Sequence, residues 1–390
     1  MILERTILER SLFEALNKTP NKIPVLMGKS GSGRTALLRR IAQQLGDTQC
    51  QYIDVERAAS TPEEFYEAVK KNTPFLFKEP KSSNVGQNGA RAAFENLLAF
   101  FDDARSQNGE NPTFLIDEFL EIRTFESFPG LRNAVQELLK KLTQSNNKFI
   151  LTTRFTTRIH RLLCDAQKRF ELINVQPFST KEVFALLRSS DINHDRTECE
   201  EISRIVHALT EGRPLYAKIL VQTLSSMNGA SSGDPVSALA SELNPGAYLY
   251  LVCLHFYELR LHHARGYGAL KGILQILAIE DTLTLTEISQ RLRRTPGSTK
   301  DYLSWLEDVD LIKVEHKRYS FSDPILKLWV RLYCRPTPPT EFEISKEVQE
   351  YAVIRLPLIE SEFVDTKIFS EREGESSHKT KEPLNIIEID

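Results

Sequence analysis

A run of small and basic residues at Gly28–Thr35 could hold a phosphate group. It reads Gly-Lys-Ser-Gly-Ser-Gly-Arg-Thr and fits the pattern G-x-x-x-x-G-K-[S/T], except that Arg34 replaces the usual lysine. The apolar run Ile23–Met27 precedes it and a helix pattern, 36–45, follows, so free N–H groups at a helix N-terminus would face the anion. We expect nucleotide to contact Gly28, Lys29, Ser30, Gly31, Ser32, Gly33, Arg34, Thr35 and Ala36.

The last two loop residues would have different roles. Thr35 would place its hydroxyl on Mg²⁺. Arg34 would meet the β- and γ-phosphates as a planar, permanently charged group. Arginine and lysine are not interchangeable at such a position, so the sequence supports binding more firmly than hydrolysis. The alternative is a Gly/Ser turn between a strand and a helix.

Two adjacent acids end a second apolar run. Thr113–Ile116 is strand-like and is followed by Asp117 and Glu118, an arrangement that resembles a Walker B strand. Phosphoanhydride hydrolysis needs a metal to neutralise charge and a group that orients water. Asp117 would hold Mg²⁺ together with Thr35, and Glu118 would orient the water. Two surface acids at a strand end are the alternative.

A third apolar run ends in Thr153 and Arg154. In a doubly wound sheet, ligands lie outside the carboxyl ends of the strands, so these side chains would face the phosphate loop. Arg154 could bind a γ-phosphate through two hydrogen bonds. Taken alone, Arg154 is better explained as a solvated turn residue; together with the other two motifs, the phosphate-binding role is favoured. Arg158 lies in the same region and could serve a neighbouring subunit.

The order of these three motifs resembles the STAND branch of the AAA+ related P-loop ATPases, close to the archaeal-type ATPase family. Thr210–Leu215 resembles the Gly-x-Pro motif of that family's helical lid, and Asp323-Pro324 with Trp329 resembles the end of its winged helix. The resemblance covers about residues 1–335. It implies that Pro214 lies near the nucleotide, which would be ATP or ADP with Mg²⁺.

The expected fold class is α/β, with a P-loop NTPase parallel sheet core, a helical lid and a C-terminal winged helix. We divide the chain into the α/β core (1–178), the lid (179–265), the winged helix (266–335) and a largely disordered tail (336–390). Within the winged helix, residues 267–279, 285–292 and 299–310 fit helices, and 311–314 with 318–321 would form the wing.

Composition favours a cytoplasmic protein without a membrane span, because Glu4, Arg5, Glu9 and Arg10 interrupt the N-terminus and no apolar run approaches 18 residues. The formal net charge is −3, so any DNA surface would be a local patch. Four acids (Asp301, Glu307, Asp308, Asp310) on or beside the third helix of the winged helix disfavour DNA binding there.

We therefore interpret the chain as an ATP-binding switch, with ATP hydrolysis expected and its nucleotide state controlling the lid, the winged helix and an unidentified protein partner. A homo-oligomer is compatible with this interpretation. One alternative is a DNA-binding ATPase that resembles replication initiators or transposition regulators. Another is a nucleotide-bound scaffold in which Arg34 has ended hydrolysis.

Overall fold

The computed structural model describes residues 5–18, 21–78, 89–163, 169–190, 195–227, 234–262 and 266–356. Its first part contains a five-stranded parallel sheet with strand order β2-β3-β4-β1-β5. The three apolar runs that precede the phosphate loop, Asp117-Glu118 and Arg154 are strands, as predicted. The strands are β1 (Ile23–Met27), β2 (Cys50–Asp54), β3 (Thr113–Asp117), β4 (Lys148–Thr153) and β5 (Phe170–Asn174).

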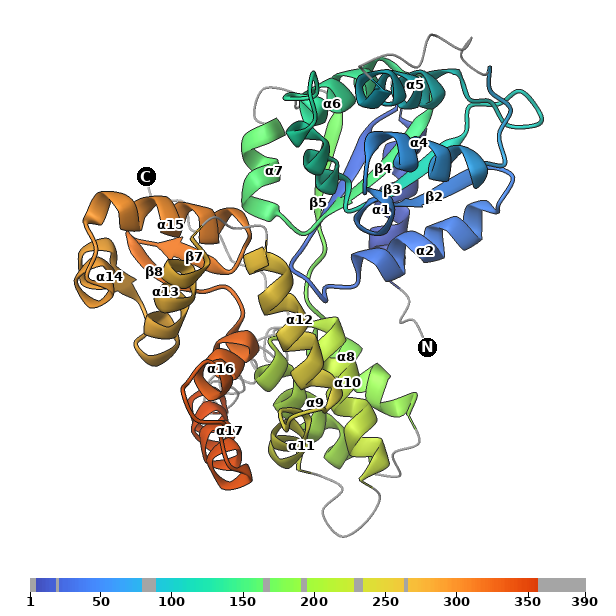
Figure 1. The fold of residues 1–390 in the computed structure, drawn as a ribbon. Coiled ribbons are helices and arrows are strands. Elements are labelled where there is room, and N and C mark those ends of the chain that lie inside the picture. The colour runs from blue at the N-terminus through green and yellow to red at the C-terminus, as the bar shows by residue number, and fades with distance from the viewer. Residues whose placement is uncertain are drawn as a thin grey trace, which may run out of the picture.

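Helices cover both faces of this sheet (Figure 1), because the strands are apolar on both sides. On one face α1 (Thr6–Asn17) and α2 (Arg34–Leu45) pack against Leu26 and Leu115. On the other face the core is rich in aromatic rings such as Phe114. The elements on that side are α3 (Val55–Ala58), α4 (Pro62–Lys71), α5 (Gly89–Asp103), the 3₁₀ segment η1 (Phe119–Ser127), α6 (Ala134–Gln144) and α7 (Thr156–Leu163).

The second part of the chain is helical and the third is mixed. The helices are α8 (Thr180–Arg188), α9 (Arg196–Thr210), α10 (Pro214–Ser226), α11 (Pro235–Glu242) and α12 (Tyr248–His262). A three-stranded antiparallel sheet with order β6-β8-β7 follows. The elements of this third part are α13 (Tyr267–Ile279), β6 (Leu283–Thr284), α14 (Leu285–Leu292), α15 (Pro296–Asp308), β7 (Ile312–Glu315), β8 (Arg318–Phe321) and α16 (Pro324–Tyr333).

Helix α15 begins earlier than predicted. The sequence suggested a turn up to Ser298, but the helix starts at Pro296. Thr295 accepts a hydrogen bond from the Ser298 N–H, which makes it the N-cap, and proline fits the first helical position because it needs no N–H donor there.

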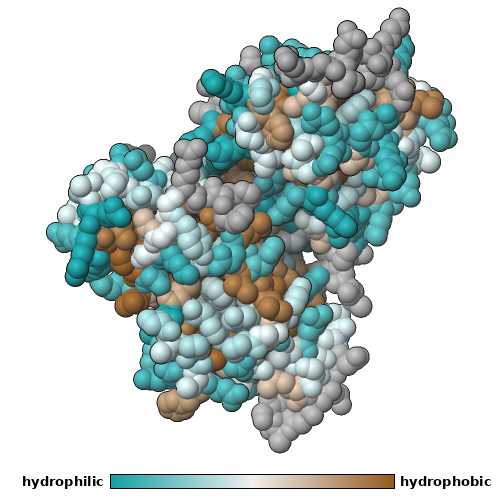
Figure 2. Space-filling model, viewed as in Figure 1, coloured by the Kyte–Doolittle hydropathy of each residue, from teal (hydrophilic) through white to brown (hydrophobic). Residues whose placement is uncertain are grey.

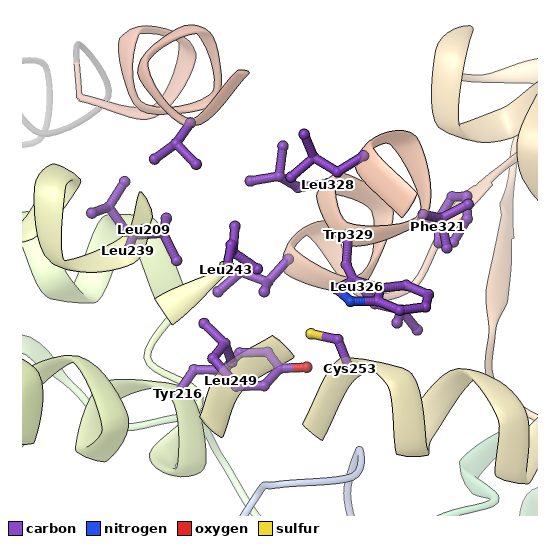
Figure 3. Packing of buried hydrophobic residues seen from close by; sticks show 14 of the residues in the cluster. Leu209, Tyr216, Leu239, Leu243, Leu249, Cys253, Phe321, Leu326, Leu328 and Trp329 are labelled. Carbon is purple, nitrogen blue, oxygen red and sulfur yellow. The ribbon is translucent and has the colours of Figure 1, made fainter. Parts of the chain in front are cut away.

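The second and third parts share one hydrophobic core. Tyr216 of α10, Cys253 of α12 and Trp329 of α16 meet in it (Figure 3). Helix α12 runs between the other parts (Figure 1). Its apolar residues lie all around its circumference, so Tyr248 and Leu251 are exposed while Leu249, Cys253 and Tyr257 are buried. We call α8–α17 with β6–β8 the lid–wing body, where α17 is the last described helix (Glu341–Arg355). The shared core predicts that these elements move together.

Part of the tail (336–390), which was predicted to be largely disordered, is helical. Helix α17 (Glu341–Arg355) follows the proline-rich turn. Thr340 and Glu343 form a capping box, and Ile344, Val348 and Ala352 are buried, in a stripe with the spacing of helix turns. The many charged residues of this segment made the apolar stripe hard to recognise in the sequence. Residues 357–390, where the rest of the tail prediction falls, lie outside the described residues.

In the described ranges, every helix is too short or too polar to span a lipid bilayer. Apolar side chains on the face drawn in Figure 2 gather near its middle, below the α/β core. Cys50, Cys199, Cys253 and Cys334 are free thiols, and Cys164 is not among the described residues.

Candidate nucleotide-binding site

The phosphate loop has the backbone of an anion cradle. Gly31 and Gly33 have φ angles of +80° and +90°, which glycine adopts without strain. A Cβ on Gly28 would come within 2.7 Å of the Ser32 Oγ. That Oγ is buried without a hydrogen-bond partner among the described atoms, a costly arrangement unless a ligand supplies one. The loop therefore fits a phosphate.

The side chain of Arg34 is held by hydrogen bonds and is not free to turn into the phosphate loop. Its side chain is 6% exposed and its guanidinium donates to the Glu118 carboxylate and, at 3.2 Å, to the Lys29 carbonyl. Arg34 Nε is buried and has no described partner. The residue predicted to bind phosphates is thus paired with the residue predicted to orient water.

Glu118 is held from several sides. It takes a left-handed conformation, with φ +51°, directly after β3. Its N–H donates to the Thr152 hydroxyl at 2.9 Å, and its Oε2 accepts the N–H of Arg154 at 3.0 Å. The structure therefore brings Arg34, Glu118 and Arg154 together, with the Glu118 carboxylate already bonded to the other two.

Asp117 has the surroundings of a magnesium ligand. It is 2% exposed, and the hydroxyls of Tyr52 (2.8 Å) and Thr152 donate to its two oxygens. Burial and the Asp117 charge raise the pKa of Tyr52, which therefore remains a donor. No described cation forms an ion pair with Asp117. Thr35, the second predicted ligand, is half-buried in the first turn of α2.

The chemistry of these donors suits Mg²⁺ held jointly with phosphates. In the described part of the chain, no group of three or more His, Cys, Asp or Glu could hold a metal alone. Mg²⁺ usually binds through one or two protein oxygens plus substrate phosphates and water, so Thr35 and Asp117 are a sufficient pair.

Arg154 is engaged by acids. Its guanidinium bonds both oxygens of Glu56, at 3.0 and 3.1 Å, and one oxygen of Glu121. Burial lowers the pKa of Arg154, but the neighbouring carboxylates, Glu118 first, outweigh this effect and raise it. Glu56 and Glu121 were not recognised from the sequence, because neither belongs to a motif. To reach a phosphate, Arg154 would have to leave these acids.

The lid–wing body is hydrogen-bonded to the tip of the phosphate loop. The Leu215 N–H donates to the Gly31 carbonyl at 3.0 Å, and Lys29 Nζ donates to the Ser322 carbonyl at 2.5 Å. Pro214 begins helix α10 beside the loop. Any rearrangement of the phosphate loop therefore directly alters its hydrogen bonds with Leu215 of α10 and with Ser322, which follows β8.

A buried charge network lies behind this contact. The Arg213 guanidinium donates to the Asp323 carboxylate, which also accepts the Tyr216 hydroxyl at 2.7 Å. Asp323 caps α16 through the N–H groups of Ile325 and Leu326. The network thus joins two motifs that were noticed only through the family resemblance.

Two of the four acids on or beside α15, Asp308 and Asp310, contact the α/β core. Asp310 accepts the N–H of Thr156 at 2.8 Å and the hydroxyls of Thr156 and Thr157, and Asp308 pairs with Arg161. The sequence analysis treated these acids only as obstacles to DNA. They are interdomain contacts, which a single sequence does not reveal.

Two cavities flank the loop. A cavity of about 40 Å³, lined by Arg5, Ala36 and Phe178 among others, lies beside α2. A larger one, about 430 Å³, lies near β5 and α7 and includes Lys29 and His160, but neither Asp117 nor Glu118. Small-molecule sites usually measure about 300–1,000 Å³, a range that includes the larger cavity, which Gly28, Lys29, Ser32 and Pro214 line.

Arg158 lies in a further cavity, of about 200 Å³, between η1, α7, α12 and α15 of its own chain. It is half-buried. This position does not suit the suggested contact with a neighbouring subunit while the lid–wing body is packed as observed.

Comparisons with known proteins show the family and the fold of the chain. The sequence model of a family described as "ATPase domain predominantly from Archaea" matches residues 6–217. No curated protein matches the chain at a significant level.

Solved structures show a similar fold. A Walker-type ATPase of Pyrococcus abyssi superimposes with a TM-score of 0.60 at 19% identity, covering 85% of this chain and 96% of its own. Cdc6p of Pyrobaculum aerophilum reaches a TM-score of 0.42 at 13% identity, covering 90% of this chain and 95% of its own.

Proposed function

Because the chain belongs to the family of ATPase domains found predominantly in Archaea, we propose that it is an ATP-driven switch whose resting state is locked by the Arg34–Glu118 ion pair. This pair is the observation that carries the proposal. Glu118 cannot orient water while its carboxylate is bonded to Arg34, and Arg34 cannot bind phosphates while it is bonded to Glu118.

ATP would resolve this competition. Its phosphates lie in the cradle Gly28–Thr35, with Ala36 beside them and Pro214 at the lid, and attract Arg34 away from Glu118. Thr35 and Asp117 would hold Mg²⁺, which would neutralise charge on the phosphates. Glu118 then orients water, and Arg154 exchanges one of its carboxylates for the γ-phosphate. ADP leaves the pair free to form again.

The same loop transmits the change. Lys29 and Gly31 are bonded to the lid–wing body, so a phosphate in the loop alters its docking. We assign residues 266–335 as a winged helix, on the basis of the helix and strand order from α13 to α16, and residues 179–265 as the lid. The output would be a protein partner or a second copy of the chain that recognises the altered docking.

The experiment is phosphate release from ATP with Mg²⁺, measured for the wild type and Glu118→Gln. We expect release to fall by about 10²-fold or more, the usual contribution of a positioned acid–base group, while ATP still binds. Glu110→Gln, an exposed acid, is the matched control. Equal release from the wild type and Glu118→Gln would refute the role of Glu118.

A further inference from the structure

Arg260 of α12 is a buried arginine that touches the phosphate loop. Its side chain is 6% exposed. One guanidinium nitrogen donates to the Ser30 Oγ at 2.8 Å, and another donates to the Asp310 carbonyl at 3.3 Å. Arg260 was not predicted as a site residue, because α12 carries no recognisable motif.

Arg260 lacks the counter-ion that comparable arginines have. Arg34 pairs with Glu118 and Arg213 pairs with Asp323, whereas no carboxylate among the described residues forms an ion pair with Arg260. Burial and the charge of Arg213 lower the pKa of Arg260, and the more distant Asp323, Asp310 and Tyr216 offset only part of this effect. A buried charge without a counter-ion is costly, so the site favours an anion.

Its position indicates which anion. Ser30 belongs to the phosphate loop, and the cavity of about 200 Å³ next to Arg260 is also lined by Arg154 and Glu121. Arg260 thus lies between the loop tip and the carboxyl ends of β3 and β4, where Glu118 must find a water and a terminal phosphate. No other described residue of the lid–wing body lines this cavity and also bonds the phosphate loop.

We propose that Arg260 binds the terminal phosphate of a nucleoside triphosphate and so distinguishes triphosphate from diphosphate. The proposal rests on the proposed function, since it needs the phosphates to lie in the loop. The guanidinium would exchange the Ser30 hydroxyl for phosphate oxygens, which form stronger charge-assisted hydrogen bonds. Its other contact, at Asp310, leads to Thr156 of the core, so the terminal phosphate would be sensed by both parts of the molecule.

The test is equilibrium binding of ADP and of a non-hydrolysable ATP analogue, each with Mg²⁺, to the full chain. In Arg260→Met, we expect triphosphate affinity to fall about 10- to 100-fold, as for a lost hydrogen bond to a charged group, and ADP affinity to stay within about threefold of wild type. Arg260→Lys should recover part of the loss. Arg123→Gln, on the exposed rim of the same cavity, should bind both nucleotides as the wild type does.

A purely structural role predicts different results. Equal losses of both affinities in Arg260→Met, or no loss of either, would overturn the proposal. If Arg260→Met does not fold, Arg260→Lys decides: a selective triphosphate defect supports the proposal, and wild-type selectivity or parallel defects overturn it. Failure of the wild-type protein to bind either nucleotide would refute the proposed function as well, so the two failures are distinguishable.

Discussion

The guanidinium of Arg34 is hydrogen-bonded to the carboxylate of Glu118, and each side chain is more than nine-tenths buried. Arg34 opens the helix after the phosphate loop and Glu118 follows the strand that ends in Asp117. A planar guanidinium binds a carboxylate more specifically than an ammonium does. In the proposed resting state, Arg34 therefore holds the Glu118 carboxylate more firmly than a lysine at the same position would.

The lock predicts that binding and hydrolysis separate in Glu118→Gln. A neutral amide cannot compete with phosphates for Arg34, so ATP affinity should rise about tenfold, the equivalent of one charged hydrogen bond of ~1.5 kcal/mol. Isothermal calorimetry with a non-hydrolysable ATP analogue measures this. Unchanged or weaker binding would show that Arg34 and ATP do not compete.

The buried pair of Arg213 and Asp323 should stabilise the lid–wing body. Asp323→Asn leaves Arg213 buried without its counter-ion, so the free energy of unfolding should fall by about 3–5 kcal/mol. Urea unfolding at pH 7 measures this, with the exposed pair variant Asp281→Asn as control, where we expect less than about 1 kcal/mol. A small effect at Asp323 would show that the network is dispensable.

The same pair predicts a pH dependence. Burial alone would raise the pKa of Asp323, but Arg213 and the Tyr216 hydroxyl lower it below its ordinary value of 3.8. A lowered pKa in the folded state means that the stabilisation is fully present above 3.8 and is lost as the pH falls through the folded pKa. The stability difference between wild type and Asp323→Asn should be constant from pH 7 to about pH 4 and shrink below it. A difference that shrinks between pH 7 and 5 would contradict this account.

Gly212 should be indispensable at the entry to the lid. It has φ +63°, and a Cβ there would lie 2.2 Å from the Phe178 carbonyl oxygen. The Gly212 carbonyl also accepts the Phe178 N–H at 2.6 Å, so neither backbone can move away cheaply. Gly212→Ala should therefore lower the melting temperature more than Gly109→Ala, which has φ +79° but no close neighbour and pays only about 1–2 kcal/mol of backbone strain. Equal shifts would show that the close contact is unimportant.

The sequence predicted the elements that follow periodic patterns and the residues that belong to motifs. Buried strands such as Ile23–Met27 are continuous apolar runs, and Gly31 and Gly33 supply the backbone that a phosphate loop needs. Arg260 and Asp310 could not be predicted, because their importance comes from contacts between segments far apart in the chain. The pairing of Arg34 with Glu118 was missed for the same reason.

The most direct test of the account is the rate of phosphate release by Arg34→Lys at saturating ATP and Mg²⁺, compared with the wild type. Lysine still binds phosphates but holds Glu118 less firmly, so release should be faster by about tenfold, which corresponds to ~1.4 kcal/mol of the barrier. Release that stays the same or slows, while ATP remains bound, would contradict the proposal that the Arg34–Glu118 pair restrains hydrolysis.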